Sequence, residues 1–332
     1  MRFLVTGGAG FIGSNYIRHL LGTDPDAEVT NLDKLTYAGN PASLADLEGD
    51  PRYTLVKADI GDQATVAEVM PGHDVVVNFA AESHVDRTIN AGTEAVTTNA
   101  VGVAVLCEAA RRAKVDRFLQ VGTDEEYGTI RSGSFTEADP LNPSSPYSAG
   151  KAGGSLVALA YARTHGLDVV VTRCTNNYGP YQFPEKVIPL FVTNLIDGAK
   201  VPLYGSGGNV RDWLYVLDHC TAIDLVLRRG TTGEVYNVGA GNELTNLELT
   251  RRLLAAFGAD DSMIEYVPDR LGHDWRYSVE VAKLRELGWS PAQSFEDGLA
   301  TTIAWYRDHE HWWRPLKQER PVSQLGLDGP GR

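Results

Sequence analysis

Short apolar runs alternate with amphipathic stretches along the first half of the chain. The apolar runs are typical of buried parallel strands and occur at residues 2–6, 29–32, 53–57, 74–79, 117–121 and 168–174. Stretches with helical spacing of apolar positions lie between them, at residues 14–21, 63–70, 94–113 and 147–165. This alternation predicts an α/β fold built on a doubly wound parallel sheet of the Rossmann type.

The alternation loosens after residue 175. Segments at residues 184–197, 212–216, 235–238 and 245–257 mix helices with short strands, and a last helix is expected around 295–309. We therefore predict a Rossmann domain over residues 1–175 and a smaller mixed α/β lobe over 176–316. The remaining residues, 317–332, are rich in Pro, Gly and polar side chains and are expected to be disordered.

Composition narrows the class of protein. With 332 residues and 43% apolar residues, the chain is long enough to bury a full core. Its net charge of -13 argues against nucleic acid or an anionic membrane as a partner, so a phosphorylated substrate would need local cations. The three cysteines are far apart, which predicts reduced thiols and neither a disulfide nor a metal site. Without a signal peptide or membrane-length apolar run, the protein is expected to be cytoplasmic.

A glycine-rich loop follows the first predicted strand and leads into a helix, which is the arrangement of a phosphate-binding turn. Gly8, Gly10 and Gly13 fit the dinucleotide fingerprint. Gly7, Gly10 and Gly13 fit the wider spacing of short-chain dehydrogenases equally well. Either set would let the backbone approach a pyrophosphate at the helix N-terminus.

The carboxylate expected to bind a ribose is Asp33, which ends the second predicted strand twenty residues after Gly13. A carboxylate at this place would repel the 2′-phosphate of NADP. The sequence therefore favours NAD as cofactor, although Lys34 beside it weakens that preference.

A second group of polar residues lies between residues 121 and 151. Tyr147 precedes Lys151 by four residues, so one helix face carries both, and the ammonium would lower the pKa of the phenol and prepare it to deprotonate an alcohol. Asp124 and Glu125 follow Thr123 and supply a separate acid and base. Simple alcohol oxidation needs no such pair, so the chemistry should exceed hydride transfer.

Polar residues also follow the fourth predicted strand, at residues 80–87, where open parallel sheets bind ligands. His84 in this segment is expected to be a hydrogen-bonded structural residue. Cations that could hold a diphosphate occur in the second half of the chain, at Lys186, Arg211 and Arg270.

Taken together, these motifs resemble the dTDP-glucose 4,6-dehydratases of the extended short-chain dehydrogenase/reductase superfamily. The resemblance rests on residues 7–13, 32–40, 80–87, 123–125 and 173–181, with Tyr147 and Lys151, and it extends to about residue 316. The Thr-Asp-Glu triplet is its most specific element. Sugar-nucleotide epimerases lack the acid pair, and the related GDP-mannose dehydratases and UDP-xylose synthases have Ser where Asp124 stands.

This resemblance implies an NAD-dependent dehydration that gives dTDP-4-keto-6-deoxyglucose. Tyr147, with Lys151 and Thr123, would deprotonate the glucose 4-hydroxyl while NAD+ takes the C4 hydride. Glu125 would then remove the C5 proton as Asp124 protonates the departing C6 hydroxyl, and NADH would return the hydride to C6. The resemblance also implies a sugar-nucleotide-binding second lobe and a homodimer formed through the helices at 94–113 and 147–165.

The binding residues follow position by position from the same resemblance. Those expected to bind NAD are Gly7, Gly10, Phe11, Ile12, Gly13, Asp33, Lys34, Thr36, Asp59, Ile60, Ala80, Ala81, Asn99, Tyr147, Lys151 and Asn177. Those expected to bind the sugar nucleotide are Ser83, Thr123, Asn176, Lys186, Val187, Pro202, Tyr204, Arg211, Asn246, Arg270, His273 and Tyr277. No metal is implied.

The chain departs from the family pattern at several positions, among them Gly122, where Ser is usual, and Glu126, where Val is usual. A third carboxylate at Glu126 would either repel the charge of Glu125 or point away into solvent, and extended alternation favours solvent. Two other functions stay open. An NAD-dependent sugar-nucleotide 4-epimerase would use Tyr147 and Lys151 without the acid pair, and a non-catalytic dinucleotide-sensing protein would need none of them.

Overall fold

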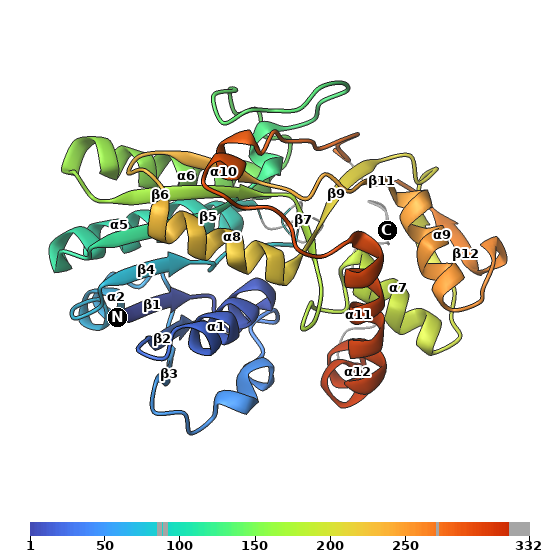
Figure 1. The fold of residues 1–332 in the computed structure, drawn as a ribbon, viewed down its shortest axis with the longest axis horizontal. Coiled ribbons are helices and arrows are strands. Elements are labelled where there is room, and N and C mark those ends of the chain that lie inside the picture. Colours follow the sequence, from blue (N-terminus) through green and yellow to red (C-terminus); the bar gives the residue numbers. More distant parts are fainter. Residues whose placement is uncertain (85–87, 89–91, 270–271, 319–332) are drawn as a thin grey trace.

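The computed structural model describes residues 1–84, 88, 92–269 and 272–318. Its larger sheet has seven parallel strands in the order β10-β6-β5-β4-β1-β2-β3 (Figure 1). These strands are β1 Arg2–Thr6, β2 Glu28–Asp33, β3 Tyr53–Lys57, β4 Val75–Asn78, β5 Arg117–Thr123, β6 Val169–Cys174 and β10 Val235–Val238. All six strands expected before residue 175 are present, and the predicted α/β class with a doubly wound parallel sheet is confirmed.

Helices cover both faces of this sheet because successive strand side chains point to opposite sides. Phe3 and Val5 of β1 belong to a core shared with α1 and α8, whereas Leu4 between them packs with α2, α5 and α6. These helices are α1 Phe11–Thr23, α8 Val216–Arg229, α2 Gln63–Val69, α5 Gly102–Ala113 and α6 Pro146–His165. The two buried faces fix the strand register, since a slip of one residue would exchange the two cores.

A smaller lobe with its own apolar core lies beside the sheet, at the right of Figure 1. Its strands are β7 Asn176–Tyr178, β8 Val201–Tyr204, β9 Val210–Tyr215, β11 Glu243–Thr245 and β12 Ile264–Val267. Its helices are α7 Val187–Ile196, α9 Asn246–Ala256, α11 Phe295–Asp308 and α12 Glu310–Gln318. The chain returns from this lobe to add β10 and α8 to the larger sheet. The boundary at residue 175 between the Rossmann domain and the smaller lobe stays a prediction.

The sequence did not predict α12, which begins at Glu310 and whose last two residues fall within the tail expected to be disordered from residue 317. Its Trp313 is fully buried and donates an indole hydrogen bond to the Tyr306 carbonyl at 2.7 Å. Lys317 Nζ lies 2.7 Å from an Asp197 carboxylate oxygen. The rest of the expected tail, residues 319–332, lies outside the described residues.

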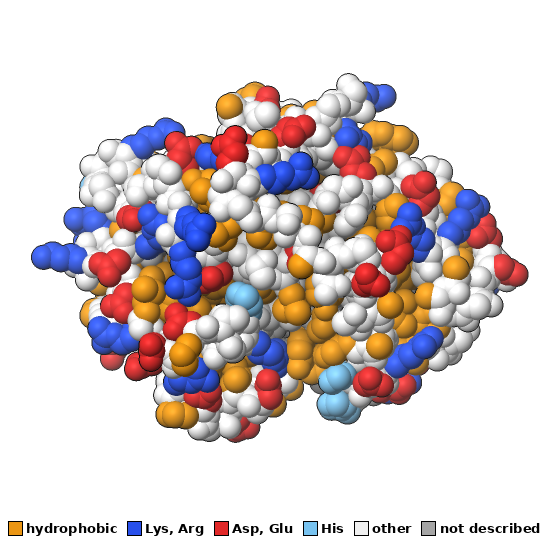
Figure 2. All heavy atoms as spheres, viewed as in Figure 1, with side chains coloured by type: hydrophobic (Ala, Val, Ile, Leu, Met, Phe, Trp, Pro, Cys, Tyr) orange, Lys and Arg blue, Asp and Glu red, His pale blue; other side chains and the backbone are white. Residues whose placement is uncertain are grey.

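Shorter elements connect these parts. They are η1 Pro41–Leu47, α4 Gly92–Val96, the π-helical turn η2 Thr97–Val101, the 3-10 turn η3 Asp124–Tyr127, η4 Asp261–Met263 and α10 Ala282–Glu286. All three cysteines are buried free thiols, as predicted. Among the described residues, none of the helices is both long and apolar enough to span a membrane. Lys and Arg side chains are interspersed with Asp and Glu on the face shown in Figure 2.

Candidate active site

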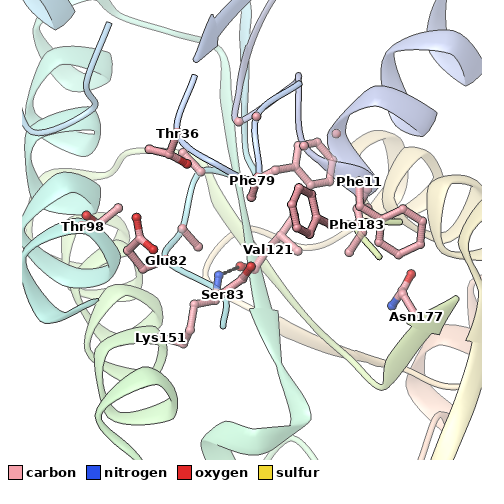
Figure 3. A pocket seen from close by; sticks show the side chains of 18 of the residues that line it. Phe11, Thr36, Phe79, Glu82, Ser83, Thr98, Val121, Lys151, Asn177 and Phe183 are labelled. Carbon is pink, nitrogen blue, oxygen red and sulfur yellow. Dashed lines mark hydrogen bonds between the residues drawn. The ribbon is translucent and has the colours of Figure 1, made fainter. Parts of the chain in front are cut away.

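A cavity opens at the carboxyl ends of the parallel strands, where the strand order reverses between β1 and β4. Figure 3 shows side chains from several segments around it, among them Phe11, Glu82, Lys151 and Phe183. The glycine loop, the Asp124–Glu125 pair and the Tyr147–Lys151 pair all contribute to its lining. The fold thus brings together residues that are up to about half the chain apart.

The structure distinguishes the two glycine sets left open by the sequence. Gly7 has φ +69°, and a β-carbon there would lie 2.6 Å from the Ala80 nitrogen. A β-carbon on Gly13 would lie 2.4 Å from the Gly7 carbonyl oxygen. Gly8 instead packs against buried Asn31 and does not line the cavity, whereas Gly7, Gly10 and Gly13 do. The wider-spaced reading is therefore the one that matches the cavity.

The loop leads into the N-terminus of α1, which provides backbone N–H groups and a positive dipole end. Gly10 is the N-cap residue and makes no side-chain capping bond, and the first turn carries no acidic residue. This end of α1 is suited to an anionic group such as a diphosphate.

Asp33 ends β2 and borders the same cavity. Its Oδ2 accepts a hydrogen bond from the Ala9 N–H at 2.9 Å, and its Oδ1 accepts one from the Leu35 N–H at 2.8 Å. Burial raises the pKa of Asp33, and these two backbone donors offset part of that shift. Lys34 Nζ lies 2.8 Å from Asp59 Oδ2, so its charge is directed toward another acid of the cavity.

The acid pair lies on a short 3-10 turn. Thr123 ends β5 and caps this turn, since its Oγ1 accepts a hydrogen bond from the Glu125 N–H at 3.3 Å. Asp124 is 3% exposed, and its Oδ2 has no hydrogen-bond partner among the described residues. Burial, and secondly the negative charge of Glu125, raise the pKa of Asp124 well above its usual range. Asp124 is thus suited to hold a proton and donate it.

Tyr147 and Lys151 lie on the first turns of α6, and both border the cavity. Lys151 Nζ donates a hydrogen bond to the Val121 carbonyl at 2.6 Å, and burial lowers its pKa. Burial, and then the charge of Glu125, raise the pKa of Tyr147 well above its usual value. The predicted lowering of the phenol pKa is therefore wrong, because burial and the nearby acids raise it.

The expectation that Glu126 points into solvent is also wrong. Its side chain is fully buried, and Oε2 lies 2.8 Å from Arg173 Nε. Residues 124–127 form a 3-10 turn rather than the extended segment that the expectation assumed. The turn directs Glu126 away from the cavity into the interior.

The chain matches known proteins over nearly its whole length. The family model described as GDP-mannose 4,6 dehydratase matches residues 4–302. A dTDP-glucose 4,6-dehydratase from Streptomyces niveus is 56% identical over 334 residues, which cover 99% of each chain. The chain belongs to the dTDP-glucose 4,6-dehydratase family.

Solved structures agree with that assignment. A dTDP-glucose 4,6-dehydratase from Streptomyces venezuelae, solved with NAD bound, has a TM-score of 0.93 at 56% identity, covering 96% of this chain and 100% of that one. A UDP-glucose 4-epimerase from Thermotoga maritima has a TM-score of 0.87 at 30% identity, covering 93% and 100%. Dehydratases and epimerases of this superfamily share the fold, so the fold does not separate the two activities.

Most residues expected to bind the cofactor of this dehydratase family gather at the cavity. All sixteen line it except Asn99. Asn99 instead supports the lining, since its amide accepts a hydrogen bond from the Glu82 N–H at 2.9 Å and donates one to the Glu82 carbonyl at 3.0 Å. It lies on the π-helical turn η2, next to α6.

The residues expected to bind the sugar nucleotide separate into two groups. Ser83, Asn176 and Lys186 line the cavity, and Lys186 Nζ donates a hydrogen bond to the Ser83 carbonyl at 2.8 Å. Thr123 itself does not line the cavity, although Gly122 before it and Asp124 and Glu125 after it do. The others lie in or beside the smaller lobe and do not line the cavity: Val187, Pro202, Tyr204, Arg211, Asn246, His273 and Tyr277. Arg270 lies outside the described residues.

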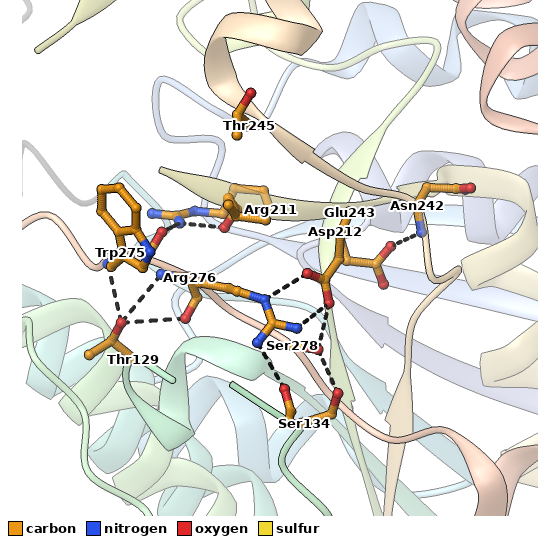
Figure 4. Close-up of polar contacts among 12 residues, drawn as sticks. Thr129, Ser134, Arg211, Asp212, Asn242, Glu243, Thr245, Trp275, Arg276 and Ser278 are labelled. Carbon is orange, nitrogen blue, oxygen red and sulfur yellow. Dashed lines mark hydrogen bonds and ion pairs between the residues drawn. The ribbon is translucent and has the colours of Figure 1, made fainter. Parts of the chain in front are cut away.

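Contacts among this second group and with neighbouring residues hold it in place. The Arg211 guanidinium lies 4.1 Å from the centre of the Tyr277 ring, and His273 Nδ1 lies 2.6 Å from Asp269 Oδ1. Arg276, directly before Tyr277, makes two hydrogen bonds to Glu243 at 2.6 and 2.7 Å (Figure 4). The segment after residue 272 is thereby fastened to β11.

Sequence reasoning named Glu82 only within the polar segment 80–87, and it missed Gln182, Phe183 and Glu185 of the cavity lining. Glu185 Oε2 lies 3.6 Å from His84 Nε2, and both side chains are buried. The structural role expected for His84 agrees with this position behind the lining. The loop at 182–185 carries no motif of its own, and only the neighbouring Lys186 could have drawn attention to it.

Proposed function

We propose that this chain is a hydro-lyase that converts dTDP-glucose to dTDP-4-keto-6-deoxyglucose, with NAD regenerated in the site. The observation that carries the proposal is the pair Asp124 and Glu125 beside Tyr147. A buried acid with a raised pKa next to a second carboxylate is what elimination of water requires, since one group must give a proton and the other must take one. A 4-epimerase has no step that uses such a pair.

The cavity fits NAD at several points. Gly7 and Gly13 let the glycine loop pack closely beside the N-terminus of α1, because β-carbons there would clash with the backbone of Ala80 and Gly7, and this tight turn lets backbone N–H groups approach a diphosphate. Asp33 is in position to accept hydrogen bonds from a ribose. When bound, NAD supplies the hydride acceptor at C4 and the hydride donor at C6. The residues proposed to bind NAD are those of the expected set. Asn99 would contribute indirectly, through its hydrogen bonds to the Glu82 backbone.

In the first step Tyr147 removes the proton of the glucose 4-hydroxyl. Burial and the charge of Glu125 raise the pKa of Tyr147, and a cationic group close to the phenol opposes that shift. Lys151 is one such group, one helical turn away on α6. Thr123 would hydrogen-bond the glucose 4-hydroxyl. This assignment makes Tyr147 the residue without which no hydride transfer begins.

Elimination follows from the ketone at C4, which acidifies the C5 position. Glu125 takes the C5 proton, and Asp124 gives its proton to the departing C6 hydroxyl, which leaves as water. The resulting C5–C6 double bond accepts the hydride at C6 and, at C5, a proton returned by Glu125 after exchange with solvent. We propose that Lys186, Arg211 and Arg270 offset the diphosphate charge, and that the other residues of the second group hold the nucleotide and sugar.

Purified protein incubated with dTDP-glucose tests this proposal. We expect a base-labile 4-keto product that is lighter than the substrate by one water. A product of unchanged mass with an inverted C4 hydroxyl would support the epimerase instead, and unchanged substrate would support a binding protein.

A second prediction concerns the choice of cofactor. We expect wild-type protein to bind NAD at least about tenfold more tightly than NADP, because Asp33 would lie against the 2′-phosphate, and a like-charge contact of this kind costs over 1 kcal/mol. Asp33→Ala should reduce this preference, whereas Asp26→Ala, an exposed acid before the same strand, should not. Titration of both dinucleotides measures this, and equal affinities in the wild type would contradict the role of Asp33.

We also propose a homodimer, supported by exposed apolar side chains on neighbouring helices. Val96, Val101 and Leu156 are 43%, 53% and 56% exposed, on α4, η2 and α6, and the three elements pack together. Sedimentation at micromolar concentration should give twice the chain mass. Leu156→Glu should weaken the dimer, whereas Leu217→Glu, an exposed leucine on α8, should not. A monomeric wild type would refute this proposal.

Buried reduced cysteines support a cytoplasmic location.

A further inference from the structure

The buried carboxylate of Glu126 has no place in the proposed chemistry, although it follows the acid pair directly. It does not line the cavity and is fully buried below the 3-10 turn. Burying a carboxylate is unfavourable unless hydrogen bonds and an opposite charge compensate for the lost hydration. The contacts of Glu126 therefore have to explain why this charge is in the interior.

Glu126 joins the catalytic turn to two other elements. Oε1 accepts hydrogen bonds from the Thr123 N–H at 3.1 Å and from Ser155 Oγ at 2.9 Å, and Oε2 lies 2.8 Å from Arg173 Nε. Ser155 lies on α6, two turns after Tyr147, and Arg173 lies on β6. One side chain thus connects the turn that carries Asp124 and Glu125 to the helix that carries Tyr147 and Lys151.

Arg173 extends the connection to the far side of the turn. Its Nη1 donates a hydrogen bond to the Tyr127 hydroxyl at 2.9 Å, and its guanidinium lies 4.7 Å from the centre of the Tyr127 ring. The Tyr127 hydroxyl in turn donates to Asn237 Oδ1 on β10 at 2.9 Å. Both ends of the four-residue turn are thereby fastened through the Glu126–Arg173 pair.

Gly122 leaves the space that Glu126 occupies. A β-carbon at residue 122 would lie 2.5 Å from Glu126 Oε1 and 3.2 Å from Ser155 Oγ. Any side chain there would displace the carboxylate, so the two departures from the family pattern form one arrangement. The same β-carbon would lie 2.7 Å from the Thr172 carbonyl oxygen, so a side chain at residue 122 could not be accommodated by a shift away from Glu126.

We infer that Glu126 is a positioning residue, which holds the Asp124–Glu125 turn at a fixed place relative to α6. This inference rests on the proposed function, because it assigns Glu126 to the elimination step of that reaction. The carboxylate also favours the ammonium form of Lys151, since its charge opposes the lowering of the Lys151 pKa by burial. Its main effect is geometric, because a misplacement of about 1 Å lowers rates by up to about a hundredfold.

Three variants graded by the contacts they remove test the inference. Glu126→Ala removes all three contacts, Glu126→Gln keeps an acceptor for Thr123 and Ser155, and Ser155→Ala removes one hydrogen bond. We expect kcat to fall by about a hundredfold, tenfold and threefold respectively. KM for dTDP-glucose should stay within about twofold, because the Glu126 side chain does not line the cavity. Glu310→Gln, which loses a surface pair with Arg314, is the control and should match the wild type.

The step affected distinguishes positioning from general loss of structure. On rapid mixing with substrate, bound NADH should accumulate in each Glu126 variant, because C4 oxidation continues while elimination is slowed. Thermal unfolding checks folding, and Ser155→Ala leaves no buried unpaired charge, so it should fold even if Glu126→Ala does not. Wild-type kcat in Ser155→Ala and Glu126→Gln, or a fall in kcat without NADH, would overturn the inference. A wild type that forms no dehydrated product would instead overturn the proposed function itself.

Discussion

Asp124→Asn and Glu125→Gln are expected to stop the reaction after the first hydride transfer. Asn keeps the shape of Asp124 but has no acidic proton for the C6 hydroxyl, and Gln at 125 cannot accept the C5 proton. General acid or base groups contribute about a hundred- to ten-thousand-fold to rates, so kcat should fall by that order in each variant. Oxidation at C4 does not use either group and should still occur.

The measurement is the absorbance of bound NADH after rapid mixing of each variant with dTDP-glucose. NADH should rise and persist, whereas in the wild type it should return quickly to NAD. Asp139→Asn, an acid in the loop after the catalytic turn whose carboxylate accepts two hydrogen bonds from Thr136, is the matched control and should behave as wild type. A variant at 124 or 125 that forms no NADH at all would show that these residues serve binding or folding.

Tyr147→Phe should fail one step earlier. The change removes the only group proposed to take the 4-hydroxyl proton, and the hydride cannot leave C4 while that proton stays in place. We expect kcat to fall by about a thousandfold or more. Mixing this variant with substrate should give no NADH, in contrast to the acid-pair variants.

Tyr161→Phe, on the outer part of the same helix, controls for the loss of a tyrosine hydroxyl from α6. It should keep full activity. NADH formation by Tyr147→Phe at the wild-type rate would remove Tyr147 from the role of base and would leave Lys151 or a water to take that proton.

The strand pattern predicted the larger sheet because each buried strand is a distinct apolar run bounded by polar residues. The carboxyl ends of the predicted strands also indicated much of the site, since Asp33 and Thr123 each end a strand at one edge of the sheet. Local periodicity could not predict that β10 returns to this sheet, because strand order depends on packing between distant segments. It also missed α12, whose internal Pro315 obscures the helical pattern.

The acid pair shows where sequence reasoning reached its limit. The identities of Asp124 and Glu125 indicated acid and base chemistry, but the raised pKa of Asp124 depends on burial that only the fold provides. Glu126 was expected in solvent because the segment was taken as extended. Its partner Arg173 lies 47 residues away in the chain, and no local pattern links the two.

Transfer of the C4 hydrogen within one sugar molecule tests the central claim most directly. The protein should be incubated with a mixture of unlabelled dTDP-glucose and dTDP-glucose deuterated at C4. The account predicts a 4-keto product that carries deuterium at C6, without crossover between labelled and unlabelled molecules, and that acquires solvent hydrogen at C5. Loss of deuterium to free NADH, with stoichiometric consumption of added NAD, would contradict the account and indicate a simple dehydrogenase.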